Sequence, residues 1–187
     1  MIEVRADSIY SNLAIGSKMK DFSLKGVDDK HYSLKDFVGK NVLVIVFISN
    51  TSRHSQAYDS RLILMQSKFE SVGAQLVAIN SNDNAYSTYE RFFAMVESSR
   101  KKGYNFPYLK DRDQRVAHIF DAVCTPEAFV FDRERILRYR GKIDDNWSNP
   151  HAVKNNYVVR AVKELLAGKD VSFSETTPVG DSIRWHY

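Results

Sequence analysis

VLVIVFISNTSRHSQAY, residues 42–58, carries the strongest structural signal in this sequence. Its first seven residues are all apolar and mostly β-branched, which is typical of a strand buried on both faces of a sheet. A polar loop, residues 49–54, follows. From Ser55 to Val72 apolar side chains recur at helical spacing until Gly73 ends the pattern. The stretch therefore predicts a buried strand, a polar loop and an amphipathic helix.

The rest of the chain continues this alternation. Gln75–Ile79 is a second short apolar run before the turn-rich SNDN of residues 81–84, and a strand–helix–strand unit normally pairs its strands in parallel. Further elements are expected in chain order: a helix at Tyr89–Val96, an extended piece in FPYLKD, a helix capped by Asp113, an antiparallel hairpin of EAFVFD and RILRYRG, and a helix at Tyr157–Leu166.

A β-α-β half, a linking helix and a β-β-α half, with Thr125-Pro126 just ahead of the hairpin, is the order of a thioredoxin-type fold. We therefore predict an α/β protein with a central mixed β-sheet flanked by helices. FSLKGVDDKHYSL, residues 22–34, predicts an added N-terminal hairpin that turns near Gly26. The chain is interpreted as one domain over residues 1–187, with an N-terminal extension at 1–15 and an extended C-terminal tail at 169–187.

Composition limits the classes of function. The 187 residues are 43% hydrophobic and 27% charged, as in an ordinary soluble domain. A formal charge of +4 is a mild excess, so basic runs such as Arg100–Lys102 are interpreted as solvated surface and no nucleic-acid partner is indicated. Residues 1–16 mix charges among apolar residues, unlike a secretory signal, and no stretch reaches the ~18 apolar residues of a membrane span. We expect a cytoplasmic protein.

Five segments carry a more specific signal because they keep their order and spacing along nearly the whole chain. With them the chain closely resembles the peroxiredoxin-like, thioredoxin-fold redoxins of the AhpC/TSA group, from about Gly16 to Trp185. The segments are GSKMKDFSLKGVDDKHYSLKDF, LVAINSND, FPYLKDRDQRVAHIFDAVCTPEAFVFDRE, YRGKIDDNW and PVGDSIRW.

In relatives of this kind the loop after the first long strand carries two cysteines. The resemblance implies that Ser49 stands at the first and that Ser52, or a neighbouring position, stands at the second. It also implies that Arg53 replaces a proline and that Asp181 stands at a further cysteine near the C-terminus. Disulfide exchange and peroxide reduction need a thiolate, which serine cannot supply. We therefore expect the usual thiol chemistry to be absent from this loop.

Cys124 is the one cysteine of the chain, so no intrachain disulfide can form. The resemblance implies that Pro126 is a cis-proline facing the loop, which would place Cys124 and Thr125 beside the same groove. Two interpretations remain open. Cys124 is either an inert buried thiol or a reactive thiol that is oxidised or captures a partner.

Other polar residues suggest weaker alternatives. Ser52 and His54 resemble a hydrolase pair, but the glycine-flanked nucleophile turn is missing. His54 and Cys124 would give a metal only two ligands, so no metal site and no cofactor are predicted. The Asp144-Asp145 pair could hold a cation, although bonds to the local backbone explain such turns as well.

Two functions from different classes follow. The first is a binding or regulatory module whose groove, between residues 49–54 and the Thr125-Pro126 turn, holds an extended peptide or small molecule, with Arg53 and His54 favouring an anionic partner. The second is a thiol-dependent oxidoreductase or antioxidant that acts through Cys124 or a partner's thiol.

Overall fold

The computed structural model describes residues 13–186, so most of the expected N-terminal extension at 1–15 lies outside the described residues. Its main sheet has the strand order β2-β1-β5-β4-β3-β7-β8, with β3, β4 and β5 parallel and the other neighbours antiparallel. The predicted mixed sheet and N-terminal hairpin are thus confirmed. The strands are β1 (Leu24–Gly26), β2 (His31–Tyr32), β3 (Val42–Phe47), β4 (Ala74–Asn80), β5 (Tyr108–Lys110), β7 (Glu127–Phe131) and β8 (Leu137–Gly141).

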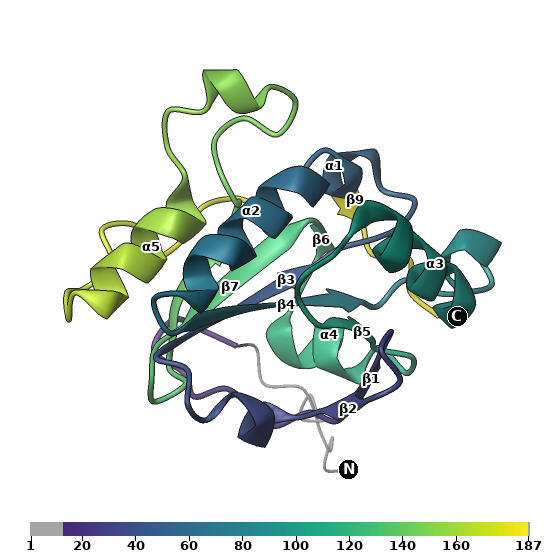
Figure 1. The fold of residues 1–187 in the computed structure, drawn as a ribbon, viewed down its shortest axis with the longest axis horizontal. Helices are drawn as coiled ribbons and strands as arrows, with labels where there is room; N and C mark the ends of the chain where they lie inside the picture. The colour runs from purple at the N-terminus through teal and green to yellow at the C-terminus, as the bar shows by residue number, and fades with distance from the viewer. Residues whose placement is uncertain (1–12, 187) are drawn as a thin grey trace, which may run out of the picture.

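Helices cover both faces of this sheet. Figure 1 shows α2 and α5 side by side across one part of it, with α4 and α3 near β5. The helices are α1 (Arg53–Gln56), α2 (Asp59–Glu70), α3 (Phe92–Lys102), α4 (Arg115–Phe120) and α5 (Tyr157–Leu166), and the 3-10 turns are η1 (Leu34–Phe37), η2 (Thr88–Glu90) and η3 (Pro150–Ala152).

Strand β3 explains how one stretch organises both halves of the core. All six of its residues are buried. Because side chains alternate across a strand, Val44 and Val46 pack in the cluster that contains α2 and α5, whereas Ile45 and Phe47 pack in the cluster that contains α4. The strand is therefore covered on both faces, as its uninterrupted apolar sequence predicts, and its last residue delivers the polar loop at the carboxyl edge of the sheet.

Three helix boundaries differ from the prediction. The single helix expected over residues 55–72 is divided into two. The short α1 starts earlier, with Ser52 as its cap, and ends at Gln56, and α2 begins at Asp59. The helix expected from Tyr89 starts at Phe92, after η2. The prediction that Asp113 caps α4 holds in part. Asp113 Oδ1 accepts the amide of Arg115, the first residue of the helix, at 3.3 Å. The residue at the capping position itself is Gln114, in a left-handed conformation, and the Asp111 carboxylate accepts the next two amides, of Val116 and Ala117.

The segment after α5 runs along the body of the protein. The backbone of Arg140 in β8 bonds to Ser174 and Thr176. The chain then forms β9 (Asp181–Ser182), which pairs antiparallel with β6 (Cys124–Thr125) in a separate two-stranded sheet. In Figure 1 β9 lies beside β6 and α1, which places the C-terminal segment against the polar loop.

Within residues 13–186, no helix has both the length and the apolar character needed to cross a membrane.

Candidate functional site

The polar loop after β3 is built around a buried carboxylate. Ser49 Oγ donates to Glu90 Oε1 at 2.6 Å, and the Thr51 hydroxyl donates to the same oxygen at 2.5 Å. The backbone amides of Asn50 and Thr51 also donate to Glu90. Asn80, at the end of β4, donates to Oε2 at 2.6 Å. One side chain from η2 thus fixes the first half of the loop.

Glu90 is only 1% exposed, so its charge state depends on these donors. Burial alone would raise the pKa of Glu90, but hydrogen bonds from Ser49, Thr51 and Asn80 outweigh it and hold the pKa below its usual range. The neighbouring Lys110 has the opposite response, because burial lowers its pKa to about 8 despite the attraction of Glu90. Glu90 is therefore an anion that organises the loop.

Ser52 fixes the second half of the loop to two distant segments. Its Oγ lies 2.6 Å from Asp181 Oδ2 in β9 and 2.9 Å from the Thr125 carbonyl in β6, and it accepts the Ser55 amide as the cap of α1. Only 4% of Ser52 is exposed. The Ser52 hydroxyl thus acts both as a donor and as an acceptor in structural hydrogen bonds.

His54 binds the same carboxylate oxygen, with its Nδ1 3.1 Å from Asp181 Oδ2. Burial alone would raise the pKa of Asp181, but the Ser52 hydrogen bond and the His54 ring lower it. In this arrangement the carboxylate stands between hydroxyl and imidazole. A serine hydrolase requires the imidazole in the middle, so the geometry does not support the Ser52–His54 pair as a hydrolase.

The Thr125-Pro126 peptide bond is cis, and Thr125 and Pro126 are both buried. Residues Ser52, His54, Thr125 and Pro126, here called the β6 site, lie together as the sequence analysis expects of the groove. The space beside Pro126 is a small cavity of about 50 Å³, which Trp147 and Val179 help to line. The C-terminal segment covers the β6 site.

Gly180 brings that segment into direct contact with the cis peptide. A Cβ atom at this position would lie 2.4 Å from the Thr125 carbonyl oxygen and 3.0 Å from Pro126 N. Only glycine allows such an approach without displacement. Downstream, the Ile183 amide donates to Val123 O, and the Ile183 side chain is buried in the α4 core.

Cys124 lies next to Thr125 in β6, and 7% of it is exposed. Burial raises the pKa of the Cys124 thiol to about 12, and the carboxylates of Glu127 and Asp181 act in the same direction. Its Sγ is 3.9 Å from the Pro126 carbonyl oxygen. A thiol in this environment is protonated at neutral pH, which disfavours nucleophilic chemistry.

Arg53 differs from its neighbours, because it is exposed at the start of α1 and makes no ion pair with any residue of the described chain. Its partner in the sequence analysis, His54, is instead bound to Asp181 and contacts the Trp147 ring at 4.2 Å between centroids. Both residues were expected to favour an anionic partner, but His54 already contacts the Asp181 carboxylate of its own chain.

The acidic pair at residues 144–145 has structural partners. Asp144, with a fully buried side chain, accepts from Tyr58 and Arg61 at 2.7 Å each. Arg61 also donates to the carbonyls of Asn146 and Trp147, which holds Trp147 near His54. Asp145 accepts the amides of residues 154 and 155. One bond is of the local kind that the turn interpretation expects, from the Asn146 amide to Asp144 Oδ1 at 3.0 Å, and the others tie the pair to α2 and to residues 154–155.

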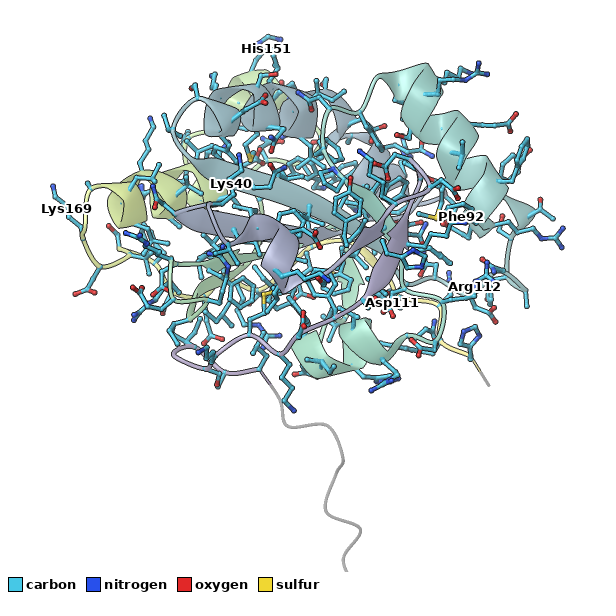
Figure 2. All side chains as sticks on the ribbon, turned by 60° about the horizontal axis from the view of Figure 1, so that its bottom comes forward. Lys40, Phe92, Asp111, Arg112, His151 and Lys169 are labelled. Carbon is cyan, nitrogen blue, oxygen red and sulfur yellow. The ribbon has the colours of Figure 1, made fainter. Side chains whose placement is uncertain are left out.

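The remaining histidines are dispersed over the structure. His151 is exposed at the outer edge of the molecule in Figure 2, His186 pairs with Asp83, and His118 stacks on Trp185. Across residues 13–186, no three histidine, cysteine or carboxylate side chains are grouped so that they could hold a metal ion.

Two residues that build the site, Glu90 and Asp181, have no local pattern in the sequence that places them there. Glu90 was hidden in the expected start of a helix, 41 residues from Ser49. Asp181 was singled out only through the family resemblance, and nothing in the sequence pattern placed it on Ser52. The local sequence Tyr89-Glu90-Arg91 contains no sign that Glu90 is buried, because glutamates are rarely fully buried.

Comparisons with known proteins agree with this architecture. A solved hypothetical protein of Sinorhizobium meliloti 1021 is 32% identical, covers 94% of this chain and 97% of its own, and superposes with a TM-score of 0.86. An uncharacterized conserved protein of Geobacillus kaustophilus is 31% identical over 93% of each chain, with a TM-score of 0.88. A putative thiol:disulfide interchange protein DsbE of Chlorobium tepidum, at 18% identity and a TM-score of 0.62 over 84% of this chain and 98% of its own, shares the thioredoxin-like fold.

Among curated proteins, the chloroplastic peroxiredoxin Q of Suaeda salsa is 26% identical over 140 residues. The match spans 70% of this chain and 61% of that relative's length. Residues 15–140, which include β1 to β7, most of β8 and the loop around Ser49 and Ser52, match the model of the AhpC/TSA family. The chain therefore belongs to the AhpC/TSA family.

Proposed function

We propose that this protein is a non-catalytic member of the AhpC/TSA family that binds an extended peptide or a small ligand at the β6 site. The observation that carries the proposal is that both loop hydroxyls are held in hydrogen bonds to carboxylates. Ser49 and Ser52, which the family resemblance aligns with the motif cysteines, are both fixed by hydrogen bonds to carboxylates, at 2.6 Å in each case. Neither can attack a disulfide or a peroxide.

The environment of Cys124 supports the same conclusion. A redox cysteine needs an accessible thiolate, usually stabilised by a nearby positive charge. Cys124 is instead buried, and this burial, with the carboxylates of Glu127 and Asp181 acting in the same direction, raises the pKa of its thiol to about 12. Thiol chemistry through Cys124, the alternative function, would have to overcome this protonated state.

Two features at or beside the β6 site are suited to binding. The backbone of β6 already pairs with the extended strand β9 and would offer the same hydrogen bonds to another extended chain, and the positive charge of the exposed Arg53 lies next to the site. Recognition without turnover needs no more than these groups. We infer that the protein acts in the cytoplasm as a binding or regulatory module.

The deciding experiment is a pair of turnover assays on the purified full chain. Under a thiol reductant we expect neither reduction of insulin disulfides nor loss of hydrogen peroxide above the rate of a protein-free control, and mass spectrometry should find Cys124 unmodified. Catalytic turnover that is lost in Cys124→Ser would overturn the proposal and establish the oxidoreductase alternative.

A further inference from the structure

The β6 site already holds an extended chain segment, and that segment belongs to the protein itself. Thr125 is in register with Asp181, and Cys124 with Ser182, in antiparallel pairing. The Ile183 amide continues the pairing by donating to Val123 O at 3.2 Å. Addition of a strand to a free edge is a common way for a protein to bind a peptide, and here the added strand is β9.

The contacts of this segment define what the site accepts. Gly180 lies so close to the Thr125 carbonyl that any Cβ would collide with it. One residue later, the Asp181 carboxylate meets the Ser52 hydroxyl at 2.6 Å and His54 Nδ1 at 3.1 Å. Two residues further, Ile183 enters the α4 core. The site thus distinguishes a small residue, an acidic residue and an apolar residue in order.

Polar groups of the body also fix the end of the segment. The Arg184 amide donates to Asn82 Oδ1 at 2.8 Å, and the Gln114 amide nitrogen donates to the Arg184 carbonyl at 2.7 Å. The Asp83 amide donates to the same carbonyl at 2.9 Å. The His186 amide then donates to Gln114 Oε1 at 2.8 Å, so the docked stretch extends from Gly180 to His186, and residues 180–183 form its part along β6.

We propose that the β6 site is a docking site for extended chains with the pattern glycine, acidic residue, any residue, apolar residue, and that residues 180–183 of this chain are its resident, autoinhibitory occupant. This inference rests on the proposed binding function and specifies its ligand. A partner carrying the pattern replaces the tail, strand for strand, and the released tail becomes available outside the site. The exposed Arg53 beside the site favours partners with further acidic residues.

Competition by the tail makes the wild-type site weak toward added peptide, because a tethered segment acts at an effective concentration in the mM range. Gly180→Ala should release the tail by steric contact with the Thr125 carbonyl. Gly39→Ala is the matched control, since nothing lies within 4 Å of a Cβ there. Hydrogen exchange of the Ile183 amide reports release in the full-length chain.

The binding test uses a fluorescent synthetic peptide of residues 176–186, TTPVGDSIRWH, and measures its anisotropy with each full-length protein. We expect Gly180→Ala to bind at least about tenfold more tightly than wild type and Gly39→Ala to match wild type. A peptide with asparagine in place of the aspartate should bind several-fold more weakly to Gly180→Ala. The double variant Ser52→Ala/Gly180→Ala should show a smaller difference in affinity between the aspartate and the asparagine peptide.

Two results would overturn the inference. The first is fast exchange at Ile183 in Gly180→Ala without any gain in peptide affinity. The second is slow hydrogen exchange at the amide of residue 183 both in Gly180→Ala and in the variant Asp181→Ala/Ile183→Ser. Such protection would mean that the tail is a fixed part of the fold. Turnover assays are independent of both readouts, so a catalytic protein that still docks the peptide would refute only the proposed non-catalytic role.

Discussion

Ser49 Oγ lies 2.6 Å from Glu90 Oε1, and this contact joins the loop after β3 to the 3-10 turn η2. Five donors from Ser49, Asn50, Thr51 and Asn80 converge on the one carboxylate. An ionised carboxylate suits position 90, because it only accepts hydrogen bonds. Its negative charge, next to residue 49, would oppose the ionisation of a thiol placed at that residue.

Replacement of Glu90 by glutamine should destabilise the protein by about 1–3 kcal/mol, because one acceptor oxygen becomes an NH₂ group that faces buried donors. Urea unfolding at pH 7 measures the change in the free energy of unfolding. Glu97→Gln on the exposed side of α3 makes the same chemical change and should alter stability little. Equal stability of the two variants would contradict the structural role of Glu90.

Alkylation of Cys124 should be very slow in the folded protein. A shift of the thiol pKa from 9.0 to about 12 lowers the thiolate fraction at pH 8 by about a thousandfold, and burial adds a steric barrier. Iodoacetamide labelling followed by intact mass spectrometry gives the rate, with the urea-unfolded chain as the reference. Labelling of the native chain at the rate of the unfolded one would show that Cys124 is accessible and ionised.

Breaking the buried pair of Arg61 and Asp144 should cost about 3–5 kcal/mol, since Asp144→Ala leaves an uncompensated guanidinium under the Trp147 loop. Asp170→Ala, at an exposed carboxylate, is the matched control. Urea unfolding supplies the free energies, and Trp147 emission should report a freed loop. A cost below about 1 kcal/mol, typical of a surface pair, would mean that solvent screens this contact.

Local patterns predicted most of the regular elements. Strand β3 was evident because it is apolar without interruption, and α5 begins and ends where its apolar stripe predicts, at Tyr157 and Leu166. These features depend on neighbouring residues, which a sequence shows directly. The break between α1 and α2 was missed, because it depends on Ser52 acting as a cap while its hydroxyl also contacts β6 and β9.

The candidate site depends on contacts that no local pattern contains. Ser49 is hydrogen-bonded to Glu90, which lies 41 residues away in the sequence, and Thr125 is hydrogen-bonded to Asp181, which lies 56 residues away. A two-residue strand such as β9 has no periodicity from which it could be recognised. The family resemblance brought Asp181 to attention, but only the fold showed that it lies against Ser52 and that the tail occupies the expected groove.

Acid should loosen the tail through Asp181. The Ser52 hydrogen bond and the His54 ring hold the pKa of Asp181 in the folded state below its ordinary value of 3.8, against the effect of burial. Folding therefore gains stability from this group above about pH 4 and loses it as the pH falls through the lower folded-state pKa. Other carboxylates titrate in the same range, so the useful quantity is the difference in unfolding free energy between wild type and Asp181→Asn, measured in urea from pH 6 to pH 2. This difference should be constant near neutrality and shrink below pH 4, whereas a difference independent of pH would mean that the Asp181 charge does not hold the tail in place.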